Sequence, residues 1–558
     1  MRKAVNLFLL LLFIFFPFHQ SFSNFISFKN GVVSSADELA SQIGIDILKK
    51  GGNAIDAAVA VGFALAVVYP QAGNIGGGGF MVIHFANGKN VSIDYREKAP
   101  SQAFKDMYLD DEGNVIENLS TIGALASGIP GSVAGMLHAL EKYGTLSRQE
   151  ILSYSIDLAE KGFIINDRFA GLLNSMQTDF KNFKSTSKIF GGRFNGGDLI
   201  VQNDLANTLK EIRDNGRDGF YNGKVADLII NEVFSNGGKF SYSDLDNYNV
   251  IERDVLKGSY RGYNVISMPP PSSGGICLLN MLNMLENYNI SGLGLGSVEY
   301  IHLVVEVMRR AYADRSEYMG DADFVNVPVN TLISKEYAKN RMLDFQPEQA
   351  NNSEEIKPGD VNKKEHLETT HYSVADKYGN CVAVTTTLND SFGNMEVVDG
   401  AGFFLNNEMD DFVIKSGVPN IYGLTGGDAN AIAPGKRMLS SMTPTIILKD
   451  NKPFLILGSP GGGKIITTVL QTIINIIDFN MELKDAIDAP RFHHQWLPDE
   501  IMTEPGVLIK STKRRLTDMG YTIINVSDFG RVDAIMFPDD KNMIGHSDKR
   551  GYGIALGY

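Results

Sequence analysis

The segment TTHYSVADKYGNCVAVTTTLN, residues 369–389, is the part of the sequence that decides the fold. It holds two runs rich in Val, Ala and Thr, joined by the turn residues Lys377–Asn380. Such runs favour strands, and the turn between them predicts a β-hairpin. The preceding residues, 346–368, are polar and charged and show no apolar period. A loose polar stretch that stops where a strand starts predicts a site at which the chain is cut.

A cut between Glu368 and Thr369 would give Thr369 an α-amine beside its own hydroxyl. A Thr hydroxyl is a poor nucleophile unless a base lies next to it. An N-terminal amine titrates at about 7.7–8.0, so it can accept the proton near neutral pH. A cut at this point would therefore make Thr369 a usable nucleophile. The alternative is an uncut chain in which Thr369 is an ordinary threonine at the edge of a strand.

A second segment, FLILGSPGGGKIITTVLQ at residues 454–471, resembles a phosphate-binding loop. An apolar strand, Gly458, Gly463 and Lys464 stand in the order that such a loop requires. Ile465 occupies the position of the hydroxyl that would bind Mg²⁺. The nucleotide-binding interpretation is therefore a distant alternative.

The N-terminus predicts export. Arg2 and Lys3 precede the apolar run Leu7–Phe16, and small residues follow near Ser23, as in a cleaved signal peptide. An uncleaved anchor is the alternative. The net charge of −14 argues against nucleic acid as a partner. The sequence has two cysteines, Cys277 and Cys381, which we expect to be buried thiols rather than a disulfide.

Helices and antiparallel strands are interwoven along the chain, with neither strict β-α alternation nor a clean linker. Ser35 and Glu38 have capping-box spacing before one helix, and Asn53 caps a second, apolar helix that ends before Pro70. Residues 147–340 are mostly helical by pattern, and a second hairpin turns at residues 449–452. This mixture predicts an α+β fold in which sheets are flanked by helices in one interwoven unit.

Several motifs in one order identify the chain as similar to a known family. TTHYSVADKYGNCVAVTTTLN, FLNNEMDDF, MLSSMTPT, GSPGGGKIITTVLQ and DAPRFHHQW resemble γ-glutamyltranspeptidase, a family of N-terminal nucleophile hydrolases. DYREKAP, GNIGGGGFM, MPPPSSGG and MRRAYADRSEYMGD extend the resemblance over the mature chain. It implies a four-layer αββα sandwich, made of a signal peptide (1–23), a large subunit (24–368) and a small subunit (369–558).

The resemblance also implies roles for single residues. Thr369 matches the nucleophile, which first attacks the Glu368 carbonyl, and Thr387 matches a threonine that orients it. Tyr422 matches the covering tyrosine of a lid loop, to which nearby glycines give mobility. The backbone N–H groups of Gly461 and Gly462 match an oxyanion hole. The remaining matches bind the γ-glutamyl group: Arg96, Ser440 and Ser441 its α-carboxylate, and Asn389, Glu408 and Asp411 its ammonium.

The implied function is the transfer or hydrolysis of the γ-glutamyl group of glutathione and related amides, with water or an amino acid or peptide as acceptor. The implied protein is periplasmic or secreted, needs no cofactor and has no stable membrane anchor. Two alternatives stay open, a glutaryl or cephalosporin acylase of the same superfamily and an exported binding protein that does not process itself.

His302 and Glu306 have helical spacing that could hold a metal, but no third ligand lies near them in sequence, so we expect a pair on a helix surface. His493 and His494 are expected to pack or to form hydrogen bonds.

Overall fold

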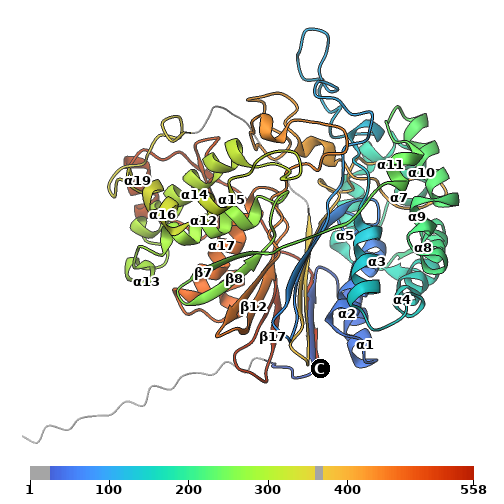
Figure 1. The fold of residues 1–558 in the computed structure, drawn as a ribbon, viewed down its shortest axis with the longest axis horizontal. Helices are drawn as coiled ribbons and strands as arrows, with labels where there is room; N and C mark the ends of the chain where they lie inside the picture. The colour runs from blue at the N-terminus through green and yellow to red at the C-terminus, as the bar shows by residue number, and fades with distance from the viewer. Residues whose placement is uncertain (1–25, 358–368) are drawn as a thin grey trace, which may run out of the picture.

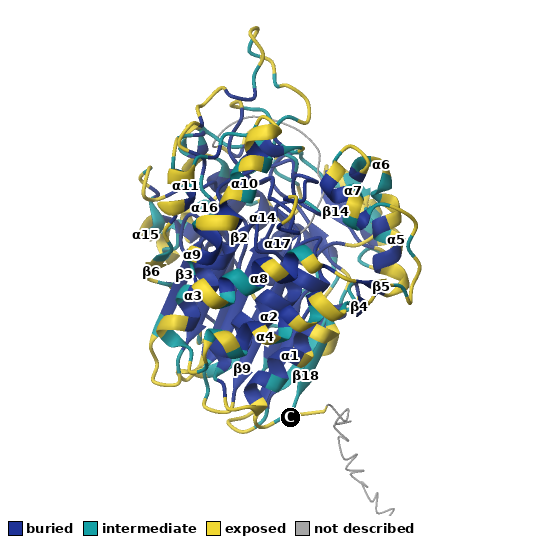
Figure 2. Cartoon of the chain, turned by 90° about the vertical axis from the view of Figure 1, so that its right-hand side faces the viewer, coloured by how far each residue is buried: buried dark blue, intermediate teal, exposed yellow. Residues whose placement is uncertain are grey.

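The structure, a computed structural model, describes residues 26–357 and 369–558. Two β-sheets form the middle of the molecule, and one layer of helices covers the outer face of each sheet (Figure 1). This is the four-layer αββα arrangement that the sequence predicts. Figure 2 shows the strands and helix α2 buried beneath helices whose outer sides are exposed.

The first sheet is antiparallel throughout and is built from both parts of the chain. Three of its strands follow residue 369 and four precede residue 358. The hairpin predicted from residues 369–389 lies at its centre, with its turn where the sequence places it. The strand order is β18 (Ile554–Gly557), β1 (Gly31–Ser35), β9 (Thr370–Asp376), β10 (Cys381–Thr387), β2 (Gly78–His84), β3 (Asn90–Tyr95) and β6 (Ile251–Arg253).

The second sheet is also antiparallel and also mixes the two parts of the chain. Its apolar inner face packs against the first sheet through residues such as Phe80, Ala383, Ile456 and Ile535. This buried layer of apolar side chains holds the sheets together. The strand order is β17 (Ile544–Ser547), β16 (Asp533–Met536), β12 (Lys452–Gly458), β11 (Thr445–Lys449), β8 (Tyr263–Ser267) and β7 (Leu256–Tyr260).

The helices divide between the two outer layers by their position in the chain (Figure 1). The first layer comes from residues before 250, and the second from residues 274–341 and 464–518. The helices of the first layer are α1 (Glu38–Lys49), α2 (Ala54–Val68), α3 (Ser132–Tyr143), α4 (Arg148–Lys161), α5 (Asp167–Ser175), α6 (Gln177–Phe180), α7 (Lys184–Phe190), α8 (Asn203–Asn215), α9 (Asp218–Tyr221), α10 (Gly223–Ser235) and α11 (Tyr242–Asp246). The second layer holds α12 (Gly274–Leu285), α13 (Ile290–Leu293), α14 (Val298–Tyr318), α15 (Val329–Leu332), α16 (Lys335–Arg341), α17 (Lys464–Ile477), α18 (Leu483–Asp488) and α19 (Lys510–Asp518).

Short strands lie outside these layers. They form one three-stranded and one two-stranded sheet. The first contains β13 (Phe492–His493), β14 (Ile501–Thr503) and β15 (Ile523–Asn525), and the second contains β4 (Phe163–Ile164) and β5 (Leu199–Ile200).

Two details of the sequence prediction need correction. Asp37, not Ser35, caps α1, because its side chain accepts hydrogen bonds from the N–H groups of Leu39 and Ala40. Ser35 ends strand β1 instead. Asn53 caps α2 in a capping box with Asp56, as predicted.

The second correction concerns His302 and Glu306. Both are buried in the second helical layer, not on a helix surface, and the ring of His302 bonds Tyr521 and the carbonyl of Gln346. The prediction of a surface pair is wrong because other elements cover this helix on several sides, so its charged residues do not lie on an exposed face. Among the described residues no cluster of potential metal ligands is found.

Cys277 and Cys381 are separate buried thiols, so the expectation for them is confirmed. In the described part of the chain, no helix has both the length and the apolar character needed to cross a bilayer.

Candidate active site

Thr369 lies at the start of strand β9, and the sheet register fixes its neighbour. Thr370 pairs with Thr386 on β10. Continuing this antiparallel register by one residue sets Thr369 opposite Thr387. Thr369 is 4% exposed, and the Thr387 hydroxyl accepts a hydrogen bond of 2.8 Å from the N–H of Asn389. The two threonines singled out in the sequence therefore lie side by side at one end of the first sheet.

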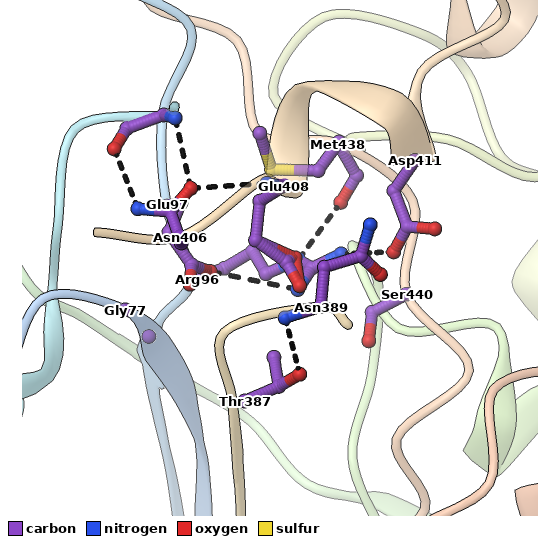
Figure 3. Close-up of polar contacts among 12 residues, drawn as sticks. Gly77, Arg96, Glu97, Thr387, Asn389, Asn406, Glu408, Asp411, Met438 and Ser440 are labelled. Atoms are coloured by element: carbon purple, nitrogen blue, oxygen red, sulfur yellow. Dashed lines mark hydrogen bonds and ion pairs between the residues drawn. The ribbon is translucent and has the colours of Figure 1, made fainter. Parts of the chain in front are cut away.

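Arg96 follows strand β3 and is the centre of a buried ionic cluster (Figure 3). Its Nη1 contacts Glu408 and lies 3.5 Å from Glu97, and its Nη2 donates to Asp411 at 2.5 Å. Its Nε donates to the carbonyl of Met438, in the chain that leads to Ser440. The structure thus brings together residues that the sequence keeps more than 300 positions apart.

This cluster contains three carboxylates but a single guanidinium. Burial raises the pKa of Glu97 to about 7 and the pKa of Glu408 well above its ordinary value, although Arg96 opposes both shifts. Burial also raises the pKa of Asp411. In return the carboxylates raise the pKa of Arg96 against the effect of its own burial. The site therefore has more negative than positive charge when all four groups are ionised.

Two oxygens in the cluster, Oε1 of Glu97 and Oε1 of Glu408, have no partner among the described residues. Glu408 is completely buried, and its Oε1 makes no hydrogen bond within the described residues. The other oxygen, Oε2, contacts Arg96. A buried acceptor without a donor is costly, and it marks a place where a ligand donor fits.

Asn389 and Tyr422 connect this cluster to the threonines. Asn389 has φ of 79° and donates from Nδ2 to the carbonyl of Asn407, which precedes Glu408. The Tyr422 hydroxyl donates to the carbonyl of Asn389. Asn420 links the loop to the cluster, since it donates to Asp411 at 2.9 Å and accepts from the N–H of Tyr422. Tyr422 and its loop are thus bonded to the cluster, and the role of Tyr422 as a lid stays a prediction.

The glycine run joins β12 to α17 and turns sharply at Gly461 and Gly462. Their φ angles are 135° and 51°, a region that favours glycine. A Cβ atom on Gly462 would lie 2.5 Å from the ring of Tyr422. Their carbonyls accept from the first N–H groups of α17, while neither of their own N–H groups has a partner among the described residues. The loop presents two adjacent backbone donors under the tyrosine cover.

Ser440 and Ser441 lie in a loop held by the Pro/Gly turn at residues 267–276. Ser273 donates from both its N–H and its hydroxyl to the carbonyl of Ser440, at 2.8 and 2.7 Å. The Ser440 N–H donates in turn to Pro271. Both serines are buried near the chain that Arg96 contacts. Figure 3 shows Ser440 on the same side of Asn389 as Asp411.

Two predictions remain to be compared with the structure, one for the residue before the cut and one for the histidine pair. Glu368 lies outside the described residues. His493 and His494 are buried and bond Thr467, Gln495 and Asp499, so the expectation that they pack and form hydrogen bonds is confirmed.

Sequence reasoning missed three supporting residues. Glu97 faces Arg96 from the adjacent position, and Asn74 donates to the carbonyl of Thr387. Asn406 accepts from the N–H of Glu408 and clamps Gly76 and Gly128 with its amide. All three lie inside the quoted motifs. Before the fold is known, however, nothing distinguishes an amide or acid that contacts a site residue from one that is only its neighbour in sequence.

A sequence profile of γ-glutamyltranspeptidases matches residues 40–558. The chain belongs to the γ-glutamyltranspeptidase family. It is 49% identical to the glutathione hydrolase proenzyme of Escherichia coli, over 95% of this chain and 92% of that protein. It is 36% identical to an acylase ACY 1 proenzyme from a Pseudomonas strain, over 95% and 93%.

Solved structures agree with this membership of the family. The γ-glutamyltranspeptidase of Helicobacter pylori has 51% identity and a TM-score of 0.58, and the match covers 60% of this chain and 97% of the H. pylori chain. A cephalosporin acylase from Bacillus halodurans has 26% identity and a TM-score of 0.85, over 97% and 98% of the two chains. The four-layer sandwich is thus the fold of N-terminal nucleophile hydrolases.

Proposed function

We propose that the protein is a self-processing γ-glutamyltransferase and glutathione hydrolase. The observation that carries this proposal is the cluster of three carboxylates and one guanidinium, which Asn389 links to Thr387, the neighbour of Thr369 in the sheet. A γ-glutamyl group carries an α-ammonium, which would supply the missing positive charge and a donor for Glu408 Oε1. Relatives named glutathione hydrolase proenzymes, at up to 49% identity, support the same substrate.

Processing would divide the chain between Glu368 and Thr369 into a large subunit, 24–368, and a small one, 369–558. Both central sheets contain strands from each subunit, so the two would stay together after the cut.

The chemistry would start at the Thr369 hydroxyl. It attacks the γ-amide carbon, and the α-amine of the same residue accepts its proton and passes it to the leaving amine. Thr387, opposite Thr369 in the sheet, holds the nucleophile in position. Water or an acceptor amine then attacks the ester carbon and releases the γ-glutamyl group from Thr369.

Gly461 and Gly462 would form the oxyanion hole. Their N–H groups are adjacent and unengaged within the described chain, and neither needs to reorganise before it bonds the oxyanion. The glycine run therefore binds a transient carbon-centred oxyanion rather than a phosphate.

The substrate would be held as a zwitterion beneath Tyr422. Asn389, Glu408 and Asp411 accept from its ammonium, while Arg96, Ser440 and Ser441 receive its carboxylate. Since Tyr422 also covers Gly462, the loop around it must move for substrate to enter. Amino acids and peptides would serve as acceptors, in the periplasm or outside the cell.

An acylase that removes glutaryl groups is the second candidate, since relatives of that kind share the fold. A glutaryl group lacks the α-amine, so it would leave the excess negative charge uncompensated. Hydrolysis of γ-glutamyl-p-nitroanilide and glutaryl-p-nitroanilide by the purified protein separates the two. We expect at least 100-fold higher kcat/KM for the γ-glutamyl compound, from roughly 3 kcal/mol for a buried charged contact. Equal rates would favour the acylase.

A further inference from the structure

Helix α14 carries three buried arginines, and one of them forms no ion pair with any described residue. Arg309 contacts Glu306 and Asp499, and Arg310 contacts Glu306 and Asp344. Arg315, on the last turn, is 5% exposed and forms no ion pair within the described residues. Its hydrogen-bond partners within the described residues are two hydroxyls: Nε donates to Ser273 at 2.9 Å and Nη2 donates to Ser441 at 3.1 Å.

A guanidinium without an ion pair in the interior destabilises the protein, because the charge loses its hydration. Two hydroxyl oxygens provide dipoles but no opposite charge. Burial accordingly lowers the pKa of Arg315 from its ordinary value, and the more distant Asp411 opposes that shift. Arg315 thus lies where an anionic ligand would stabilise the protein.

The contacts of Arg315 lead directly to the site. Ser441 is one of its two partners, and Ser273, the other, holds the carbonyl of Ser440. Tyr312, one turn earlier on the same helix, donates to the carbonyl of Gly463 next to the oxyanion loop. One face of α14 therefore supports both the serine loop and the glycine loop.

Arg96 is the obvious cation for an α-carboxylate, but in this structure Glu408 and Asp411 already occupy its guanidinium. We propose that Arg315 is a positioning residue that supplies positive charge to the α-carboxylate subsite through the hydroxyl of Ser441. The inference rests on the proposed function, since it assumes that the carboxylate of a γ-glutamyl group lies at Ser440 and Ser441. Arg315 polarises the Ser441 hydroxyl and holds it as a donor toward the ligand.

The test compares two competitive inhibitors of γ-glutamyl-p-nitroanilide hydrolysis by the processed enzyme. L-glutamate carries the α-carboxylate, and its α-amide carries a neutral group of the same size. In the wild type we expect glutamate to have the lower Ki. In Arg315→Gln the ratio of the two Ki values should fall about tenfold, the effect of one hydrogen bond to a charged group. Arg315→Lys keeps the charge but not the planar fork, so it should retain most of the preference.

A merely structural role would raise both Ki values together and leave their ratio unchanged in Arg315→Gln, which would overturn the inference. If that variant does not fold, Ser441→Ala and Ser440→Ala form a matched pair. Only the Ser441 side chain bonds Arg315, while that of Ser440 accepts from the N–H of Met442. Ser441→Ala should lose more of the preference, and equal losses would reject the role of Arg315.

Failure of the proposed function would look different. The wild type would then release no nitroaniline from the γ-glutamyl compound, or would bind glutamate and its α-amide equally. If the wild type prefers glutamate to its α-amide and Arg315→Gln shows the same preference, only the role of Arg315 is contradicted.

Discussion

The molecule contains two buried ionic clusters that differ in balance. Around Glu306, Arg309 and Arg310 both approach one carboxylate, and each of its oxygens accepts at least one hydrogen bond. With Asp344 and Asp499 this cluster has three carboxylates for two guanidiniums, but these two acids reach the surface, where water stabilises their charge. Its buried part, Glu306 with the two arginines, therefore has no excess of negative charge. Around Arg96, three carboxylates, of which Glu97 and Glu408 are fully buried, share one guanidinium, and these two each keep an oxygen without a partner among the described residues.

The difference teaches how to separate structure from function in a buried ionic group. A balanced cluster is complete as folded and holds together segments distant in sequence, here α14 and the chain before residue 358. An unbalanced cluster is complete only with a ligand of the missing sign. By this criterion the Arg96 cluster lacks a cation and Arg315 lacks an anion. The ammonium and the carboxylate of an α-amino acid group would provide both.

The largest effect on stability should come from the balanced cluster. Glu306→Ala removes the carboxylate between two buried arginines and should lower the free energy of unfolding by about 3–5 kcal/mol. Chemical denaturation measures this loss. Asp344→Asn, at the exposed end of the cluster, is the control and should cost less than about 1 kcal/mol. A small loss in Glu306→Ala would show that the cluster is not a structural element.

Asp411→Asn should affect activity rather than stability. It removes a negative charge that would meet the substrate ammonium, so kcat/KM for γ-glutamyl-p-nitroanilide should fall about 100-fold, whereas the melting temperature should hold or rise. Asp410→Asn is the matched control, since Asp410 is buried next door but bonds Ser120 and the N–H of Ile421 instead of Arg96. An equal loss of activity in both variants would refute the assignment.

Glu97 should make the unbalanced cluster sensitive to pH. Its pKa is raised to about 7 in the folded protein by burial, so the folded state holds its proton more tightly than the unfolded state. Between pH 4.5 and 7 the wild type should therefore lose stability relative to Glu97→Gln as the pH rises, by up to about 3 kcal/mol. Unfolding free energies of both proteins at pH 5 and pH 8 measure the change. A constant difference would mean that Glu97 titrates normally.

The smallest effect should come from the cover of the site. Tyr422→Phe keeps the ring against Gly462 and loses the hydrogen bond to the carbonyl of Asn389. This should raise KM about 2- to 10-fold, the effect of one hydrogen bond. Asn420→Ala tests the same loop from the side of Asp411. Unchanged kinetics in both variants would show that the loop does not retain the substrate.

The sequence predicted most of the architecture because the decisive signals are local. The hairpin at residues 369–389, the cap at Asn53 and the glycine turn at Gly461 each depend on a few adjacent residues. The resemblance to a family supplied the candidate site, and the structure connects those residues by hydrogen bonds and register.

The remainder depends on packing that sequence spacing does not reveal. His302 and Glu306 looked like a surface pair because helical periodicity does not show how many sides of a helix are covered. Arg315 gave no signal either, since its importance comes from its contacts with Ser273 and Ser441 and from the lack of an ion pair to it within the described residues. The excess of carboxylates at Arg96 is likewise a property of the assembled site.

The measurement that tests the account most directly is the intact mass of the purified protein with N-terminal sequencing. The account predicts two chains, of which the smaller starts at Thr369, and predicts a single uncut chain for Thr369→Ala. One uncut chain in the wild type, in a folded and exported sample, would leave Thr369 without an α-amine to act as base. That result would contradict the central claim and favour a binding protein with the same fold.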